Sequence, residues 1–356
     1  MKKGNKKGLS TVVTTLIIVL LVIVAIGIIW AVIGNLIRTG SEEVNTGRIS
    51  VSLDVMRVEV QPNGDVDVYV KRNLGEGDLS GVKLLLTSPS GATKIITEST
   101  IEELGESKFM ITSAAHGLGS VKSVAVFPVI KTSSGKEIDG QVLDTQPLAY
   151  QDVVKSTSNL VAYWRFEGDA DDEIGSHDGT CTRCPSYVPG QVGQSANFDG
   201  VDDTIIAANP FSYSAGTNSW TVIGWARTER QIQNFIVGPS IGAVNAIVLH
   251  SSSGIEALCV LELGSYCIWK PLNHVNQWKH FAVTYDTSSL KFFGDGNQIT
   301  SGGSGTTYTG TFSVARVGGR EETSTYYHTD GSIDELAIFS RTLTPEEVKA
   351  LYDATK

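Results

Sequence analysis

The segment Gln277-Trp-Lys-His-Phe-Ala-Val-Thr-Tyr-Asp286 alternates large apolar side chains with smaller ones. Phe281, Val283 and Tyr285 share one face of an extended chain, and the residues between them share the other. A β-strand of an antiparallel sheet with one buried face has this pattern. The segment therefore predicts a strand that is packed on one side.

The residues that follow predict a hairpin and one short helix. Asp295-Gly296 follows the run Leu290–Phe293 after one residue, and its glycine supplies the positive φ that a tight hairpin turn needs. Thr344-Pro345-Glu346-Glu347 has the form of a capping box with proline in the first helical position. Val348 and Leu351-Tyr352 can then pack against the sheet. Two stacked antiparallel sheets with one terminal helix are the expected assembly.

A series of motifs runs in fixed order through residues 155–356. They are Leu160-Val-Ala-Tyr-Trp-Arg-Phe166, Asp172-Glu-Ile-Gly175, His177-Asp-Gly179, Gly190-Gln-Val-Gly193, Ala196-Asn-Phe-Asp-Gly-Val-Asp-Asp203, the strand quoted above and Gly331-Ser-Ile-Asp-Glu-Leu-Ala-Ile-Phe-Ser-Arg341. The series resembles the laminin-G-like, concanavalin A-type jellyroll of bacterial and archaeal surface proteins.

This resemblance implies a structural calcium ion between the early aspartate loop and the final strand. Matched residue by residue, it points to Asp172 and Asp334, with Asp199 and Asp203 as weaker candidates. Calcium takes six to eight oxygen ligands from carboxylates and carbonyls. The alternative is that Asp172, Asp199 and Asp203 cap turns, as aspartate does readily.

Residues 41–150 show short alternating runs separated by turn residues. Ile49, Val51, Leu53 and Val55 alternate with polar residues, and Pro62-Asn-Gly-Asp65 is a strong turn signal. Strands of this length and spacing predict a β-sandwich resembling an immunoglobulin fold, which would serve as a spacer or pilin-like head domain. Residues 147–158 read as a linker to the jellyroll.

The first forty residues predict a single transmembrane helix. Lys2, Lys3, Lys6 and Lys7 precede an uncharged apolar run over 9–37, which is long enough to cross a ~30 Å hydrocarbon core. The Lys-Gly8-Leu9-Ser junction resembles the class III signal of archaeal type IV pilins, which implies cleavage between Gly8 and Leu9 and assembly into a filament. The expected fold class is thus an all-β ectodomain, an immunoglobulin-like β-sandwich followed by a concanavalin A-like jellyroll, on one N-terminal transmembrane helix.

Charge gives the expected orientation and excludes one class of partner. The bias of positive residues places the N-terminus in the cytoplasm and residues 41–356 outside, as a single-pass protein of the cell membrane. The chain has 28 Lys and Arg against 38 Asp and Glu, and five of the basic residues but none of the acidic ones lie in residues 1–40. The remainder is strongly acidic, which opposes binding to nucleic acid.

The four cysteines form two close pairs in the sequence. Cys259 and Cys267 flank an apolar run, as facing positions of a hairpin would, and Cys181 and Cys184 would close a very small loop. Two disulfides are the favoured interpretation for an extracellular domain. A four-cysteine zinc site is the alternative, because Cys-x2-Cys is a usual half of such sites.

Catalysis is not expected. Jellyroll β-glucanases carry Glu-x-Asp-x-x-Glu with the carboxylates on one strand face. The nearest match here, Glu167-Gly-Asp169-Ala-Asp-Asp172-Glu173, has the wrong third residue and favours a turn. The alternative function is a surface carbohydrate-processing enzyme of the same fold.

The predicted function is a non-catalytic cell-surface protein that presents the jellyroll for glycan or protein binding in adhesion. Carbohydrate modules present aromatic faces, and the ligand-binding candidates are Trp269 and the loop residues Tyr326 and Tyr327. Tyr213 and Trp220 are further exposed candidates. The tryptophans in strand motifs are expected to lie in the core; they are Trp164, Trp225 and Trp278.

Overall fold

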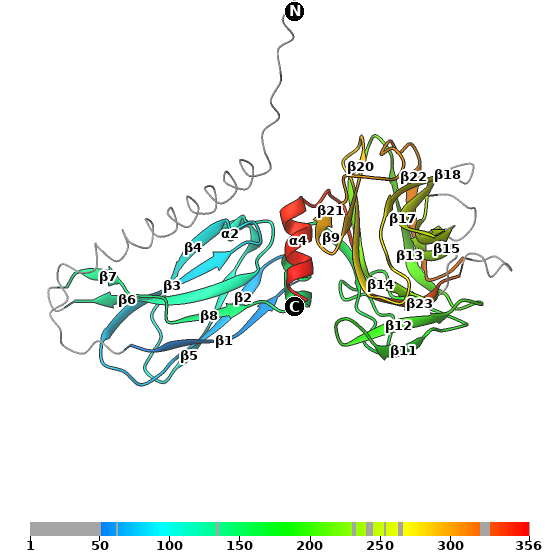
Figure 1. The fold of residues 1–356 in the computed structure, drawn as a ribbon. Coiled ribbons are helices and arrows are strands. Elements are labelled where there is room, and N and C mark those ends of the chain that lie inside the picture. Colours follow the sequence, from blue (N-terminus) through cyan, green and yellow to red (C-terminus); the bar gives the residue numbers. More distant parts are fainter. Residues whose placement is uncertain are drawn as a thin grey trace, which may run out of the picture.

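The computed structural model describes residues 51–355, apart from 62, 133–134, 230–232, 240–244, 253, 263–265 and 321–327. The described chain consists of strands, with three short helices. Two β-sandwiches follow one another along the sequence, and Figure 1 shows them side by side with helix α4 between them. The all-β part of the predicted fold class is therefore confirmed.

The N-terminal β-sandwich has one sheet in the order β1-β2-β5 and another in the order β4-β3-β6-β7, with β8 also paired to β6. Alternating valines on β2 and leucines on β3 are fully buried, so the apolar pattern of the sequence places the core between the sheets. The elements are β1 (Leu53–Val60), β2 (Val66–Arg72), β3 (Asp78–Thr87), β4 (Thr93–Glu98), β5 (Glu106–Ile111), α2 (Ser113–His116), β6 (Ser123–Lys131), β7 (Glu137–Asp139) and β8 (Asp144–Pro147).

The segment expected to be a linker contains a packed helix, α3 (Tyr150–Ser156). Its Val153 and Val154 are buried, and the Ser156 hydroxyl accepts a hydrogen bond from the Val121 amide at 3.0 Å. The polar residues of this stretch suggested an exposed connection, but the apolar pair in its middle anchors it to the sandwich.

The jellyroll contains a seven-stranded sheet, β10-β13-β22-β15-β16-β17-β18, and an eight-stranded sheet, β11-β12-β23-β14-β19-β20-β21 with β9 paired to β23. Its strands are β9 (Leu160–Trp164), β10 (Gly179–Thr180), β11 (Ser186–Pro189), β12 (Gln194–Asp199), β13 (Ile205–Ser214), β14 (Trp220–Thr228), β15 (Gln233–Gly238), β16 (Ile247–Ser252), β17 (Ile255–Glu262), β18 (Tyr266–Pro271), β19 (Lys279–Tyr285), β20 (Leu290–Gly294), β21 (Asn297–Gln298), β22 (Thr311–Val317) and β23 (Asp330–Phe339).

The core of the jellyroll lies between these two sheets. Phe281, Val283 and Tyr285 of β19 point into it, as their alternation predicts. The hairpin turn at Asp295-Gly296 joins β20 to β21, and both residues have positive φ. Helix α4 (Pro345–Asp353) begins with the predicted capping box at Thr344.

Much of the outer face of the eight-stranded sheet is buried. Its apolar side chains belong to the same buried cluster as α3, α4 and the N-terminal sandwich, so one core runs from one domain into the other. In Figure 1, α4 stands against this face. The sheet residues of the shared cluster are Tyr163, Ile223, Ala282, Phe293, Ala337 and Phe339.

The transmembrane helix is the part of the predicted fold class that needs correction. No helix in the described part of the chain is long and apolar enough to cross a membrane. The longest described helix, α4, has nine residues, whereas about 20 are needed. The predicted location as a single-pass membrane protein depended on this helix and is corrected together with it. Residues 1–40, the Gly8–Leu9 processing site and the filament drawn from them lie outside the described residues.

Candidate functional site: the outer face of the seven-stranded sheet

Two sheet faces of the jellyroll point away from its core, and only one is shared with the N-terminal sandwich. The other belongs to the seven-stranded sheet. On this face a second, smaller buried cluster lies across β15, β16 and β17, with Cys267 and Trp269 of β18 packed against it. The cluster consists of Phe235, Ala246, Val248, Cys259 and Leu261.

Strand register places Trp269 at the end of an apolar row on this face. Val248 is opposite Cys259, and Cys259 is opposite Trp269, so the three side chains follow one line across the sheet. Trp269 is half-buried, because β18 is the edge strand and no further strand covers its outer side. Its indole therefore rests on a packed surface and remains partly open to solvent.

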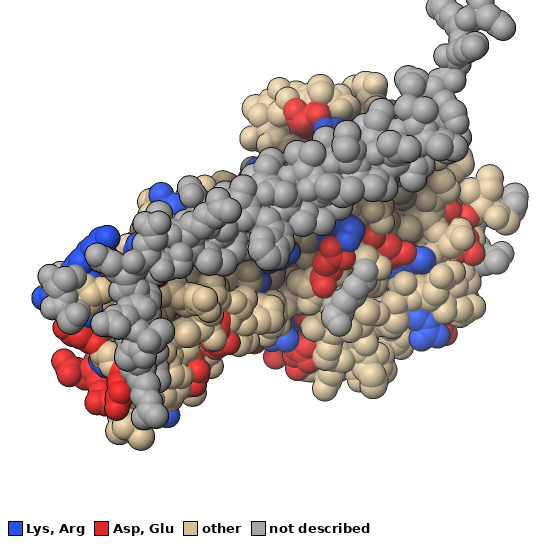
Figure 2. Space-filling view, turned by 60° about the vertical axis from the view of Figure 1, so that its left-hand side comes forward, with Lys and Arg blue, Asp and Glu red and all other residues tan. Residues whose placement is uncertain are grey.

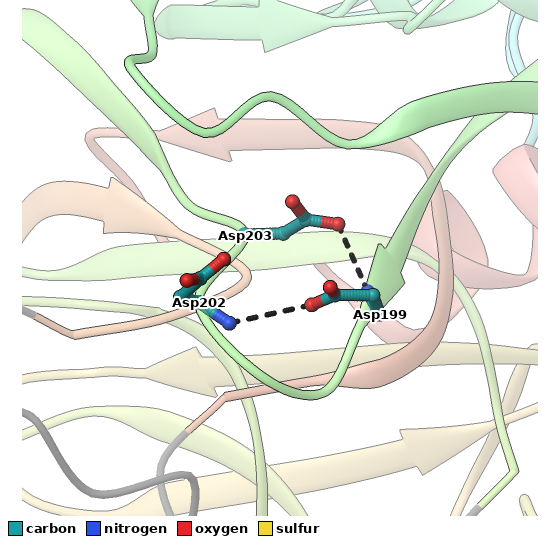
Figure 3. Close-up of side chains that lie close together, drawn as sticks. All are labelled: Asp199, Asp202 and Asp203. Atoms are coloured by element: carbon teal, nitrogen blue, oxygen red, sulfur yellow. Dashed lines mark hydrogen bonds between the residues drawn. The ribbon is translucent and has the colours of Figure 1, made fainter.

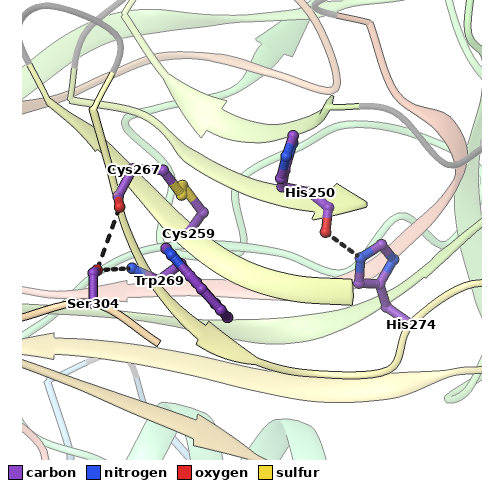
Figure 4. The surroundings of a disulfide bond; sticks show 6 residues. All are labelled: His250, Cys259, Cys267, Trp269, His274 and Ser304. Atoms are coloured by element: carbon purple, nitrogen blue, oxygen red, sulfur yellow. Dashed lines mark hydrogen bonds between the residues drawn. A yellow bond between two sulfur atoms is a disulfide. The ribbon is translucent and has the colours of Figure 1, made fainter. Parts of the chain in front are cut away.

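The loop 301–305 fixes the main chain of Trp269. The Trp269 amide donates to Ser304 Oγ at 2.9 Å (Figure 4). The Ser304 amide donates to the Trp269 carbonyl at 3.1 Å. A Cβ on Gly303 would stand 2.0 Å from that carbonyl, so only glycine fits there. Sequence reasoning missed Ser304, since nothing in a Ser-Gly-Gly-Ser-Gly run shows which strand edge it covers.

Two histidines lie beyond the same row. His250 of β16 is half-buried, and burial lowers its pKa. His274 is fully buried: its Nδ1 is 2.8 Å from Thr228 Oγ1, and its Nε2 is 3.2 Å from the His250 carbonyl. The Glu256 carboxylate accepts the His274 amide at 2.6 Å. His274 thus connects Thr228, His250 and Glu256 through hydrogen bonds. The His250 side chain lies on the same sheet face as Trp269.

Both predicted cysteine pairs are disulfides. Cys259–Cys267 joins β17 to β18 beneath Trp269, and Cys181–Cys184 closes the loop between β10 and β11. No cysteine in the described chain is free, so the alternative four-cysteine zinc site is excluded.

The turn after β12 gathers three carboxylates. Asp199, Asp202 and Asp203 lie within 4.8 Å of one another through their ligand atoms (Figure 3). Asp199 Oδ1 accepts the Val201 amide at 2.8 Å, and Asp203 Oδ2 accepts the Asp199 amide at 2.9 Å. Burial and the two neighbouring carboxylates raise the pKa of Asp203. Asp202 was missed at first, although the Asp-Gly-Val-Asp-Asp spacing could have indicated it.

Asp172, the first predicted calcium ligand, serves its own loop. Its Oδ1 accepts the amides of Tyr163 and Ile174 at 2.8 and 3.1 Å, and its Oδ2 accepts those of Ser176 and His177 at 3.2 and 3.1 Å. Both oxygens are therefore engaged by the main chain. The turn-capping alternative describes this residue.

Asp334, the second predicted ligand, lies fully buried on β23. Its Oδ2 accepts the amides of Gln191 and Val192 at 2.8 and 2.9 Å, and its Oδ1 has no hydrogen-bond partner in the described chain. Burial raises the pKa of Asp334 to about 7. Among groups of three or more possible ligands in the described residues, Asp199, Asp202 and Asp203 form the only one, so neither Asp172 nor Asp334 belongs to such a group.

Glu335, next to Asp334 on β23, is held by two residues from the first strand of the jellyroll and the position that follows it. It has φ +53° and is fully buried, and the Tyr163 hydroxyl donates to it. Arg165 Nε is 3.6 Å from its second oxygen. Burial raises the pKa of Glu335 to about 8. Its position beneath the shared core makes it a structural group.

The aromatic candidates divide between surface and core. Trp269 and Tyr213 are half-buried, whereas Trp220 is fully buried, contrary to the expectation that it is exposed. Trp220 is the first residue of the central strand β14, and its ring stacks on Phe312 with centroids 4.5 Å apart. Trp164 and Trp225 are buried as expected, and Trp278 is half-buried. Tyr326 and Tyr327 lie outside the described residues.

The glucanase-like acids lie in a bend. Gly168 has φ +99°, and the Glu167 carboxylate is held by Arg165 at 3.2 Å and by the Gln194 amide at 3.1 Å. Glu167 and Asp169 therefore do not share a strand face. On the face in Figure 2, basic and acidic side chains are interspersed over the described surface.

The comparisons with known proteins agree with the jellyroll. Residues 199–349 match the family described as the concanavalin A-like lectin/glucanases superfamily. This match and the two-sheet topology support a concanavalin A-like jellyroll domain in this part of the chain. None of the curated proteins compared with the chain matches it significantly.

Three of the solved structures that match part of the chain are as follows. Domain 4 of an extracellular arabinanase of family GH43 from Geobacillus stearothermophilus, in complex with arabinotriose, is 24% identical with a TM-score of 0.42, over 54% of this chain and 98% of that one. The binding domain of Paraclostridial Mosquitocidal Protein 1 is 17% identical with a TM-score of 0.41, over 55% and 52%. Trypanosoma rangeli sialidase with sialic acid is 10% identical with a TM-score of 0.39, over 83% and 61%. The chain thus spans about half of the toxin domain, and the fold assignment rests on the topology and the family match.

Proposed function

We propose that the jellyroll is a non-catalytic glycan-binding module that acts in adhesion, with Trp269 as its principal contact. The observation that supports this most is a half-buried indole at the edge of the one sheet face that the N-terminal sandwich does not share. A large aromatic ring offers apolar area to the C–H face of a sugar and a polar N–H at its edge.

The surroundings of Trp269 favour binding because they hold the residue before a ligand arrives. The Cys259–Cys267 disulfide lies below it, and both main-chain groups of Trp269 are hydrogen-bonded to Ser304. A side chain that is already ordered loses little conformational entropy on binding. His250 lies on the same sheet face, in the row next to that of Trp269 and two strands away.

Binding of the full-length chain to a glycan array tests the proposal. We expect Trp269→Ala to lower affinity at least about tenfold and Trp269→Phe to keep part of it, since loss of a central aromatic contact costs about 2 kcal/mol or more. Trp278→Ala, which removes another half-buried indole from the residue before β19, is the matched control and leaves binding unchanged. Binding that survives Trp269→Ala, or recognition of proteins alone, contradicts the proposal.

The alternative is a carbohydrate-processing enzyme. Incubation of the bound glycans with the protein separates the two functions, because a binding module leaves them intact. Release of new reducing ends would establish hydrolysis and overturn the non-catalytic assignment.

Calcium is proposed as a structural ion at the turn that carries Asp199 and Asp203, where Asp202 adds a third carboxylate. Oxygen ligands at short spacing suit calcium, and an ion that binds only the folded state raises stability. We expect millimolar calcium to raise the melting temperature and excess chelator to lower it, with the effect abolished in Asp202→Asn. A melting temperature that chelator leaves unchanged contradicts the site.

A further inference from the structure

Two chain segments cross between the sheets at the same edge of the jellyroll. Residues 181–185 lead from β10, at the edge of the seven-stranded sheet, to β11, at the edge of the eight-stranded sheet. Residues 200–204 lead from β12, which pairs with β11, to β13, which pairs with β10. These crossovers connect the two layers where the sandwich is open.

Arg183 ties one crossover to the other. Its Nε is 3.1 Å from Asp202 Oδ2, and its carbonyl accepts the Thr204 amide at 3.2 Å. Arg183 stands between Cys181 and Cys184, so the four-residue disulfide ring shapes the loop that presents both of its contacts. The ring thus carries the residue that contacts the acidic turn.

The two disulfides of the protein differ in accessibility. Cys184 is exposed and Cys181 is half-buried in a surface loop, whereas Cys259 is fully buried in β17 and Cys267 is covered in part by the Trp269 cluster. Thiol–disulfide exchange requires a thiolate to reach a sulfur atom, and exposed disulfides are the labile ones. A short ring also restricts the unfolded chain less than a long one does.

We propose that Cys181–Cys184 is a thiol–disulfide exchange site, which a dithiol opens in the folded protein and which thereby releases the hold of Arg183 on the acidic turn. The first thiolate attacks Cys184 Sγ, forms a mixed disulfide there and expels Cys181 as a thiolate. The second sulfur of the reagent, as a thiolate, then attacks the reagent sulfur that is bonded to Cys184 Sγ. This step expels Cys184 as a thiolate. The dithiol is oxidised to its disulfide, and the protein disulfide gains two electrons.

The charges around the loop act in opposite directions on the expelled thiolates. The Arg183 guanidinium, between the two cysteines in sequence, favours a thiolate. Asp202, which is paired with Arg183, and the neighbouring Asp199 and Asp203 oppose it. The three carboxylates therefore favour the protonated thiols in the reduced loop, and the Arg183 guanidinium favours the thiolates. This inference does not depend on glycan binding.

Differential alkylation of the full-length folded chain tests the exchange. The protein is equilibrated with increasing dithiothreitol, and in a second arm with a reduced dithiol oxidoreductase, then alkylated and mapped by mass spectrometry. We expect Cys181 and Cys184 to be labelled at a dithiol concentration about tenfold or more below that needed for Cys259 and Cys267, with unchanged circular dichroism. Comparison of the two arms shows whether a small dithiol or a protein dithiol opens the disulfide at the lower concentration. Labelling of both pairs together, or of Cys181 and Cys184 only on unfolding, overturns the proposal.

Hydrogen exchange tests the coupling to the acidic turn. In Cys181→Ser/Cys184→Ser, amide exchange over residues 199–204 should accelerate at least about tenfold, as it should in the reduced protein, because the contacts of Arg183 are lost. Cys259→Ser/Cys267→Ser is the matched control and leaves these amides unchanged. Unchanged exchange in the first variant overturns the link between the disulfide and the turn.

Discussion

His280 occupies an unusual position for a titratable residue. Its ring is fully buried between Trp225 and Tyr352, with centroids 5.3 and 5.5 Å away, and neither ring nitrogen has a hydrogen-bond partner in the described chain. Asp353, on α4, is the charged group that acts on it through space. A proton on this imidazole would be a buried charge without a partner.

We predict that His280 makes the fold sensitive to acid. Burial lowers its pKa to about 3 from the value of 6.5 expected in the unfolded chain, so the unfolded state takes up the proton first. Stability that is fully present above pH 6.5 is lost as the pH falls towards 3, by about 1.4 kcal/mol for each pH unit. Urea unfolding at pH 7 and pH 4.5 measures this loss in the wild type and in His280→Phe. The variant, which cannot titrate, should lose about 2–3 kcal/mol less over this interval. Parallel losses in both proteins would contradict the prediction.

Individual residues could be predicted from the sequence where the signal is local. The cysteine pairs follow from short spacing, and the cap at Thr344 follows from residues within one turn. Trp220 was placed on the surface because its burial depends on Phe312, 92 positions away in the chain. The four main-chain amides that the Asp172 oxygens accept leave no mark in the sequence, and calcium at Asp172 stays a prediction.

At the scale of elements, the edge strand β18 and the loop beside it form one unit. An open strand edge tends to pair with other chains, and a covering loop prevents this. Here the loop 301–305 approaches so closely that Gly303, at φ +77°, leaves no space for a side chain. Ser304 takes the hydrogen bonds that a further strand would have made with Trp269.

Gly303→Ala should disrupt this unit. The new Cβ would stand 2.0 Å from the Trp269 carbonyl, so the loop or the strand end must move. We expect a loss of about 1–3 kcal/mol in unfolding free energy, from the strained conformation and the clash, together with weaker glycan binding. The matched control is Gly305→Ala, two residues away, where no atom lies within 4 Å of the added Cβ. Equal stability and binding in both variants would show that the close approach is unimportant.

Elements were predicted well where alternation was regular and poorly where it was absent. Strand β19, the β20–β21 hairpin and helix α4 lie where the patterns place them. The stretch that forms helix α3 reads as a linker in the sequence, because seven residues carry too little periodicity to distinguish a helix from an extended connection.

At the scale of the whole molecule, the sequence indicated two domains but not the core between them. Each outward-facing residue of the eight-stranded sheet, such as Ile223 or Phe339, looked like one more member of a strand. The residues that cover them come from α3, α4 and a sandwich more than 100 positions earlier in the chain. No local pattern carries that information, because which sheet face another domain covers is decided by the packing of distant segments.

The shared core predicts that the two domains unfold together. Val154 is fully buried in α3, within the cluster that contains both the sandwich valines and the jellyroll sheet face. Val154→Asp places an unpaired carboxylate there and should cost about 3–5 kcal/mol.

Tryptophan fluorescence reports on the jellyroll, since every tryptophan of the described chain lies in it, and amide exchange in β2 and β5 reports on the sandwich. We expect the urea midpoints of both probes to fall together in Val154→Asp. Gln151→Asp, in the first turn of the same helix where an acidic side chain is tolerated, is the control and should change stability by less than about 0.5 kcal/mol. If only the sandwich signal shifts, the domains are energetically independent in spite of the shared cluster. If both shift, the jellyroll depends for its stability on the domain that precedes it, and the face that carries Trp269 is held in a fixed orientation relative to that domain.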